Sequence, residues 1–261
     1  MNSKLNNQKV KGVGPYLHDS SPVYGQIHSI ETCGMVDGPG IRYVIFMQGC
    51  PLRCLYCHNP DALSFTGGKA ISVDEVVKDI SKYKSYISGD KGGVTISGGE
   101  PLAQIDFVRE VFERCEEMGI HTTLDTSGFV DVERVKDLLE YVNLVLLDIK
   151  SITPKQHIKV TGFSNEKIIK FANYLKKIKK PIWIRFVLVP GLTDDLDEIK
   201  KMEEFLSAMD NVEKIEVLPF HKMGEFKWKE LGYEYKLKDT PTPTKELVEK
   251  VRSILVPPLS H

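Results

Sequence analysis

The sequence lacks three features that would each point to a particular class of protein: an excess of one charge, a long apolar run and a signal peptide. Its 35 lysines and arginines nearly balance 36 acidic residues, so no basic excess is available for phosphate backbones and we expect no nucleic-acid partner. No stretch approaches the ~18 consecutive apolar residues of a membrane helix, and residues 1–24 contain no apolar signal-peptide core. We therefore expect no membrane span and a cytoplasmic location, where thiols stay reduced.

Cysteine is scarce, yet three of the five cysteines crowd into eight positions. Cys50, Cys54 and Cys57 have the spacing C-x3-C-x2-C, and His58 follows directly. Zinc would need a fourth ligand, such as His58 or a distant residue. Covalent haem fits the C-x-x-C-H pattern of "CLYCH" but is attached outside the cytosol. A [4Fe–4S] cluster held by three thiolates leaves one iron open to a substrate, and the spacing favours this third alternative.

Strand and helix patterns alternate six times along the chain. Apolar β-rich runs predict strands at 41–50, 93–100, 121–128, 144–150, 182–191 and 212–221. Amphipathic stripes predict helices that begin near 73 and 105, and further helices at 131–142, 165–180, 194–209 and 243–255. This alternation predicts parallel strands with right-handed helical crossovers. The expected fold class is α/β, a partial (β/α)6 TIM-like barrel over residues 25–261, with residues 1–24 as a loosely attached extension.

Residues able to carry chemistry gather where the predicted strands end. In order they are Gln48 to Cys57, then Gly98, Gly99, Glu100 and Pro101, then Asp125 and Thr126, then Asp148 and Lys150, then Arg185 to Gly191, and finally His221. In barrels and open parallel sheets the active site lies at the carboxyl ends of the strands. The sequence therefore predicts a site at this edge.

The cysteine motif resembles that of the radical S-adenosylmethionine (SAM) enzymes when it is taken together with two neighbours. Tyr56 stands just before the last cysteine, and "GGEP" ends the second predicted strand. Further segments, from "VDGPGIRYVIFMQGC" through "IHTTLDTSGF" and "LVLLDIK" to "NVEKIEVLPFH", are similar to the activators of glycyl radical enzymes along nearly the whole chain. Many such activators carry a ferredoxin-like insert after the first motif. Here 61–72 leads straight to the next helix, and only Cys33 and an apolar-face thiol, Cys115, remain.

The resemblance implies a [4Fe–4S] cluster and SAM as cofactors, with Cys50, Cys54 and Cys57 as the cluster ligands. It implies a set of SAM contacts: Tyr56, His58, Gly98, Gly99, Glu100, Asp125, Lys150 and His221. It also implies a monovalent cation, Na⁺ or K⁺, near the SAM carboxylate at Asp125, Thr126 and Asp148, where two carboxylates would otherwise repel that group. Asp37 and Arg185 resemble positions near the incoming glycine loop of the protein substrate.

The resemblance further implies that SAM is cleaved reductively and that the resulting 5′-deoxyadenosyl radical removes hydrogen from a glycine of a partner enzyme. A flavodoxin or ferredoxin-type protein would supply the electron, and the chain would be a monomer. The lysine run at 175–180, "LKKIKK", is either a solvated helix face or a docking surface for such an acidic donor.

Less specific interpretations stand beside each of these assignments. Asp148 and Lys150 can form a simple ion pair, Arg185 a structural salt bridge and Asp125 a helix cap, while His221 can be a surface histidine. A radical SAM enzyme that acts on a small molecule, an activator of another glycyl radical enzyme and a zinc-stabilised α/β binding module are the alternative functions. Bound iron and acid-labile sulfide separate the zinc module from the others.

Overall fold

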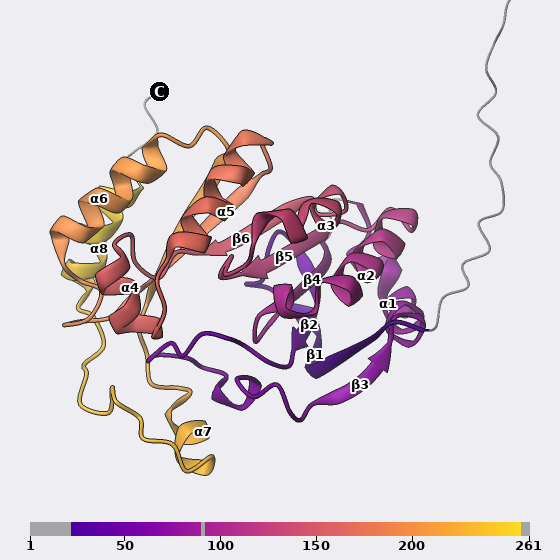
Figure 1. Cartoon of the computed structure of the whole chain (residues 1–261), viewed down its shortest axis with the longest axis horizontal. Helices are drawn as coiled ribbons and strands as arrows, with labels where there is room; N and C mark the ends of the chain where they lie inside the picture. The colour runs from indigo at the N-terminus through magenta and orange to yellow at the C-terminus, as the bar shows by residue number, and fades with distance from the viewer. Residues whose placement is uncertain (1–21, 90–91, 257–261) are drawn as a thin grey trace, which may run out of the picture.

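Six parallel strands make up most of a single eight-stranded sheet in the computed structural model, which describes residues 22–89 and 92–256 (Figure 1). These strands are β2 (Ile41–Met47), β4 (Gly92–Gly98), β5 (Thr122–Thr126), β6 (Leu144–Asp148), β7 (Ile182–Leu188) and β8 (Val212–Pro219). They pair in the order of the sequence. The predicted partial (β/α)6 barrel is confirmed.

Two antiparallel strands that the sequence did not indicate extend one edge of the sheet. β1 (Tyr24–Gly34) pairs with β2, and β3 (Lys69–Ser72) pairs with β1. Most of β1 is exposed and polar, and β3 has four residues, so neither produces the apolar run that marks a buried strand. Of the predicted extension, residues 1–21 lie outside the described part of the chain.

Helices follow the strands, and most of them cover one face of the sheet. They are α1 (Val73–Ile87), α2 (Ile105–Glu117), α3 (Lys136–Glu140), α4 (Pro154–Thr161), α5 (Glu166–Lys177), α6 (Leu196–Ser207), α7 (Glu225–Glu230) and α8 (Lys245–Leu255), with 3-10 turns η1 (Pro60–Ala62), η3 (Pro101–Gln104) and η4 (Val132–Arg134). α1 begins at a capping box, in which the Ser72 hydroxyl accepts from the Glu75 amide at 3.3 Å and the Glu75 carboxylate accepts from the Ser72 amide at 2.9 Å. The helix predicted at 131–142 is divided into η4 and α3, which meet at Val135.

The two faces of the sheet differ in chemistry because side chains alternate along each strand. The outer face packs under the helices and is apolar; its buried residues include Tyr43, Ile45, Val94, Ile96, Leu124, Val145, Leu147 and Ile184. The inner face consists of the intervening residues and carries the polar side chains of these strands among apolar ones; the polar residues include Arg42, Thr95, Ser97, Thr123, Asp125, Asp148 and Arg185. Fold stability therefore comes mainly from one face, and the other is available for a site.

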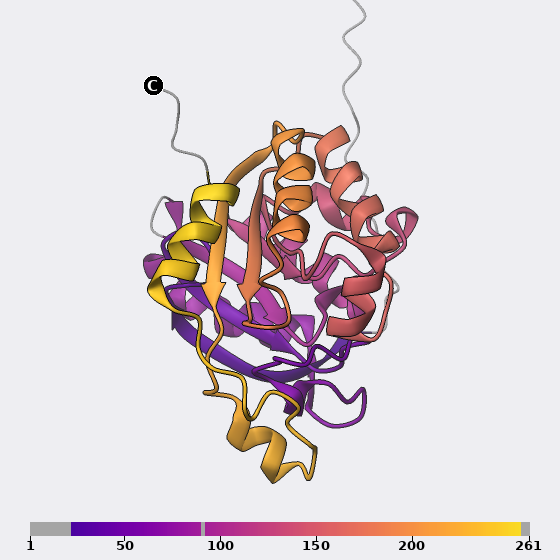
Figure 2. The ribbon, with the colours of Figure 1, turned by 90° about the vertical axis from the view of Figure 1, so that its left-hand side faces the viewer.

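The segment around α7 lies beyond the carboxyl ends of β7 and β8, apart from the other helices (Figure 2). It contacts η1, which closes the cysteine segment. None of the described helices is long and apolar enough to cross a membrane.

Candidate active site

A cavity of about 330 Å³ opens at the carboxyl ends of the strands. Most of the predicted site residues line it: Asp37, Cys50, Cys54, Tyr56, Cys57, His58, Gly98, Gly99, Asp125, Thr126, Asp148, Lys150 and Arg185. Two predicted residues, Glu100 and His221, do not line it. The residues predicted at the strand ends therefore lie together, because the carboxyl ends of parallel strands meet at one edge of the sheet.

The cysteine segment is an irregular loop after β2 that backbone hydrogen bonds hold on both sides. The Cys50 amide donates to the Leu63 carbonyl at 3.2 Å, and the Leu55 amide donates to the Val160 carbonyl at the end of α4 at 3.0 Å. The Arg53 guanidinium donates to the Cys50 carbonyl at 2.6 Å. These hydrogen bonds fix the backbone from which the thiols project.

The three thiols fit a cluster better than a single metal ion. Cys50, Cys54 and Cys57 pack in one apolar group with Leu52 and Leu63. Within residues 22–89 and 92–256, no three His, Cys, Asp or Glu side chains could hold one metal ion, as a structural zinc site requires. In a [4Fe–4S] cube each thiolate binds a different iron, so the sulfurs need only surround a shared space. The residues present fit a [4Fe–4S] cluster with three protein ligands.

Burial controls the protonation of these thiols. Burial raises the pKa of Cys57 to about 12, and it also raises the pKa values of Cys50 and Cys54. The thiols therefore keep their protons at neutral pH until a metal takes the place of the proton. Cys115 is buried on the inward face of α2, and Cys33 is exposed on β1; neither lines the cavity.

The glycine pair after β4 lies against the start of the cysteine loop. The Gly99 amide donates to the Met47 carbonyl and the Glu100 amide to the Gly49 carbonyl, both at 2.8 Å. A Cβ at Gly99 would stand 2.3 Å from the Gly49 carbonyl oxygen, so a residue with a side chain cannot fit there. Only bare backbone can border the cavity at this point.

Glu100 points away from the cavity. Its carboxylate accepts hydrogen bonds from the hydroxyls of Thr126 and Ser127, each at 2.5 Å, and from the Ser127 amide at 3.0 Å. Burial raises the pKa of Glu100, and these donors oppose the rise. In this arrangement Glu100 ties the end of β4 to the end of β5.

Opposite charges alternate across the inner face at the cavity floor. Arg185 donates to Asp125 at 3.2 Å and to Glu216 at 3.3 Å, and Lys150 donates to Asp148 at 2.5 Å. Burial raises the pKa of Asp125. Burial alone would lower the pKa of Lys150, but Asp148 holds it well above its ordinary value. Both simple interpretations, the Asp148–Lys150 ion pair and the Arg185 salt bridge, therefore describe this structure, and the helix cap at Asp125 is wrong because no helix follows it directly.

His221 contacts His58 and does not line the cavity. The two rings stack with centroids 4.3 Å apart, and His58 Nε2 lies 3.1 Å from the His221 carbonyl oxygen. Burial lowers the pKa of His58, so its ring is neutral at pH 7.

Sequence reasoning missed Arg42, which is fully buried. Its guanidinium donates to the Val94 carbonyl at 2.6 Å, to the Thr123 hydroxyl at 2.8 Å and to the Thr95 hydroxyl at 2.9 Å. Thr95 in turn donates to the Asp37 carbonyl at 2.7 Å. Arg42 therefore organises the loop that carries Asp37, and the available signal was a lone charged residue inside an apolar strand run.

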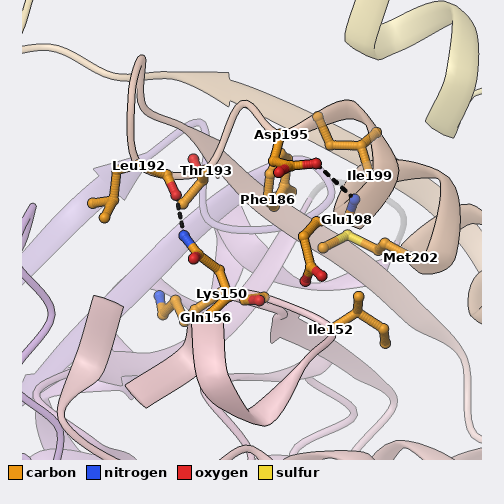
Figure 3. Close-up of a pocket in the computed structure, with 11 residues that line it drawn as sticks. Lys150, Ile152, Gln156, Phe186, Leu192, Thr193, Asp195, Glu198, Ile199 and Met202 are labelled. Carbon is orange, nitrogen blue, oxygen red and sulfur yellow. Dashed lines mark hydrogen bonds between the residues drawn. The ribbon is translucent and has the colours of Figure 1, made fainter. Parts of the chain in front are cut away.

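Lys150 also borders a second cavity on the α6 side, of about 10 Å³ (Figure 3). This volume corresponds to about one water molecule. Figure 3 shows Gln156 donating to the Leu192 carbonyl and Asp195 capping α6 through the Glu198 amide. The space is a packing gap beneath the loop after β7 and is too small for a cofactor.

A sequence model of the radical SAM superfamily matches residues 44–206. The chain is 47% identical over 239 residues to the pyruvate formate-lyase-activating enzyme of Listeria monocytogenes serovar 1/2a, which covers 89% of this chain and 96% of that protein. It is 47% identical over 235 residues to pyruvate formate-lyase 1-activating enzyme of Escherichia coli K12, with the same coverage.

Solved structures agree with the fold. A crystallised domain of pyruvate-formate lyase-activating enzyme from Bacteroides vulgatus superposes with a TM-score of 0.54 at 30% identity, covering 63% of this chain and 92% of that one. Streptococcus suis SuiB bound to S-adenosylmethionine gives a TM-score of 0.62 at 18% identity over 82% of this chain and 47% of that one, which supports the fold alone. The resemblance predicted from the motifs is confirmed: the chain belongs to the radical SAM superfamily and, within it, to the pyruvate formate-lyase-activating enzymes.

Proposed function

We propose that the cavity at the carboxyl edge installs the glycyl radical of pyruvate formate-lyase by reductive cleavage of SAM. The observation that carries the proposal is that the three cysteines, the Gly98–Gly99 backbone and the alternating charges of the inner face line one cavity. The family implies a [4Fe–4S] cluster and SAM, and the thiols of this chain fit that cluster.

When bound, the cluster would supply the one electron needed to split the SAM sulfonium into methionine and a 5′-deoxyadenosyl radical, which would take a hydrogen atom from a glycine Cα of the lyase. Cys50, Cys54 and Cys57 would hold the cluster. The Gly98–Gly99 backbone would receive the amino group of SAM, and Tyr56 and His58 would flank its adenosine. Glu100 and His221 would position these residues: Glu100 links the end of β4 to the end of β5, and His221 stacks on the His58 ring.

In this proposal a monovalent cation takes the place of the Lys150 ammonium beside Asp148. In this structure the Lys150 ammonium donates to Asp148 at 2.5 Å. A Na⁺ or K⁺ ion at Asp125, Thr126 and Asp148 would replace the ammonium beside Asp148 and free it for the carboxylate. Removal of monovalent cations should therefore weaken SAM binding in the wild type and much less in an Asp148→Asn variant.

Asp37 and Arg185 would meet the glycine loop of the lyase. Arg185 links the Asp37 loop to the floor, because its guanidinium donates to the Val36 carbonyl and to Asp125. Burial raises the pKa of Asp37. A carboxyl group with a raised pKa can accept a hydrogen bond from a peptide N–H when ionised and donate one to a peptide carbonyl when protonated. A flavodoxin or ferredoxin-type protein would provide the electron, and we expect the chain to act as a monomer.

The test uses protein reconstituted anaerobically with iron and sulfide, reduced, and mixed with SAM and pyruvate formate-lyase. We expect a glycyl-radical doublet in the electron paramagnetic resonance spectrum, absent without SAM. 5′-Deoxyadenosine without a doublet would assign the chemistry to a small molecule or another glycyl radical enzyme. Bound zinc without sulfide would contradict radical chemistry altogether.

A further inference from the structure

Two backbone carbonyls at the end of α4 hold the cysteine loop. The Arg53 amide donates to the Thr161 carbonyl at 2.9 Å, and the Leu55 amide donates to the Val160 carbonyl at 3.0 Å. The last carbonyls of a helix have no partner within the helix, so the end of α4 is satisfied by binding this loop. The two amides flank Cys54, and the position of its thiol therefore depends on where α4 ends.

A buried histidine holds the turn that follows α4. His157 is fully buried, and its Nδ1 lies 2.6 Å from the Phe163 carbonyl oxygen. A carbonyl can only accept, so Nδ1 carries the proton of the ring. Burial lowers the pKa of His157, so the ring is neutral at pH 7. The Thr161 hydroxyl closes the same turn by accepting from the Phe163 amide at 3.2 Å.

Asn165 joins this turn to the segment that carries Lys150. Its buried side-chain amide donates to the Ser151 carbonyl at 3.1 Å and to the Ile152 carbonyl at 2.7 Å. These two residues directly follow Lys150 in the sequence. The turn after α4 is therefore tied to both sides of the cavity, to the cysteine loop through α4 and to Lys150 through Asn165.

Packing alone does not account for a histidine at this position. Nε2 of His157 is buried and has no hydrogen-bond partner among residues 22–89 and 92–256. An unpaired buried acceptor costs free energy that an apolar ring of similar shape would not. The contribution of the imidazole therefore lies in the hydrogen bond that Nδ1 makes.

We propose that His157 is a positioning residue that fixes the cysteine loop relative to Lys150 by donating from Nδ1 to the Phe163 carbonyl. The proposal rests on the proposed function, since it concerns where the cluster ligands and Lys150 of that reaction stand. His157 does not line the active-site cavity, so it acts through the turn and not on a bound molecule. Without this donor the Phe163 carbonyl would be left unpaired, and the end of α4 would no longer hold the loop in one place.

The test compares two amides, each of which reproduces one nitrogen of the ring. In His157→Asn the amide NH₂ stands near the position of Nδ1 and can donate to the Phe163 carbonyl, whereas in His157→Gln it reaches toward the position of Nε2. The reduced apo chain is treated with iodoacetamide, and peptide mass spectrometry follows each cysteine. We expect His157→Gln to speed alkylation of Cys54 and Cys57 about five- to tenfold, and His157→Asn to stay within about twofold of the wild type.

Cys115 is an internal control in every variant, because it is buried on α2 and lies outside the cysteine loop. We expect its alkylation rate to be unchanged in His157→Gln. Phe112→Ala is the matched destabilised variant, since it removes a fully buried ring from α2. It should speed alkylation at Cys115 more than at Cys54 and Cys57.

Reconstituted protein tests the side of the cavity that carries Lys150. Titration with SAM, followed by the electron paramagnetic resonance spectrum of the reduced cluster, should show weaker SAM binding in His157→Gln and wild-type binding in His157→Asn.

Two results would overturn the proposal. Equal acceleration at Cys115 and Cys54 in His157→Gln would reduce the role of the ring to general stability. Equal behaviour of the Asn and Gln variants would contradict donation from Nδ1. A wild-type chain that binds no cluster would instead refute the proposed function, because the alkylation rates are measured on the apo chain and do not depend on it.

Discussion

The outer and inner faces of the same six strands differ in what they bury: apolar side chains on the outer face and charged groups on the inner face. On the outer face, side chains such as Ile45, Ile96 and Leu147 are fully buried under helices, and each contributes about 1.5–3 kcal/mol by leaving water. On the inner face, Arg42, Asp125 and their neighbours bury charge, which costs free energy unless every group finds a partner. The period-two alternation of a strand lets one segment of sequence serve both purposes.

The comparison teaches where substitutions should act. Changes on the outer face should lower the free energy of unfolding and leave the chemistry of each folded molecule intact. Changes at the carboxyl end of the inner face should remove chemistry and leave the fold intact. Arg42 and His121 lie deeper on the inner side, toward the amino ends of the strands, and should show intermediate behaviour.

The largest effect should come from a pair of cysteine variants that separates the two faces. Cys54→Ala removes a cluster ligand, so we expect loss of bound iron and sulfide and of SAM cleavage, with the fold retained. Cys115→Ala removes a buried thiol of α2, so we expect full cluster content and a slight loss of stability. Iron and sulfide assays with circular dichroism measure both, and loss of the cluster in Cys115→Ala would show that the ligands are wrongly assigned.

Phe112→Ala should have the largest effect on stability. Phe112 is fully buried on α2 against the outer face, and the cavity left by its ring should cost about 3–5 kcal/mol of unfolding free energy. Urea unfolding followed by circular dichroism measures this loss. SAM cleavage per folded molecule at low temperature should match the wild type, and a large fall in that value would break the division between the faces.

Arg42→Met should affect both properties. The variant leaves the Val94 carbonyl and two threonine hydroxyls without their donor, which should cost about 2–3 kcal/mol of unfolding free energy. The loop that carries Asp37 would loosen, so we expect a higher KM for pyruvate formate-lyase with little change in SAM cleavage in its absence. Arg42→Lys should restore stability only in part, because an ammonium cannot reproduce the planar set of donors. An unchanged KM would make Arg42 purely structural.

The smallest effect should be a pH dependence centred on His121. Burial and the nearby Arg42 guanidinium, 3.3 Å from Nδ1, lower the pKa of His121 to about 4. In the unfolded chain His121 takes up a proton near pH 6.5, whereas in the folded chain it stays neutral down to about pH 4. The contribution of His121 to the free energy of unfolding is therefore complete above pH 6.5 and declines as the pH falls toward 4. In His121→Gln the decline between pH 6.5 and 4 should be shallower in urea unfolding. Parallel curves would contradict a buried neutral ring.

The sequence predicted the six parallel strands and most of the cavity lining because both depend on local patterns. Apolar runs mark strands, and parallel strands bring their ends together whatever lies between them. It could not predict β1 or β3, which extend one side of the sheet and are stabilised by pairing rather than by burial. It also predicted that Glu100 and His221 contact SAM, and neither lines the cavity, because position along the chain does not reveal which way a side chain turns after a strand ends. Arg42 escaped notice because its partners come from strands distant in sequence.

The most direct test of the account follows the hydrogen atom itself. Pyruvate formate-lyase with deuterated glycine is treated with SAM and the reduced, reconstituted chain, and the 5′-deoxyadenosine is analysed by mass spectrometry. If the cavity delivers the radical directly to the glycine Cα, the product carries one deuterium and forms in step with the glycyl radical. Unlabelled 5′-deoxyadenosine formed alongside a glycyl radical would contradict direct abstraction at this site.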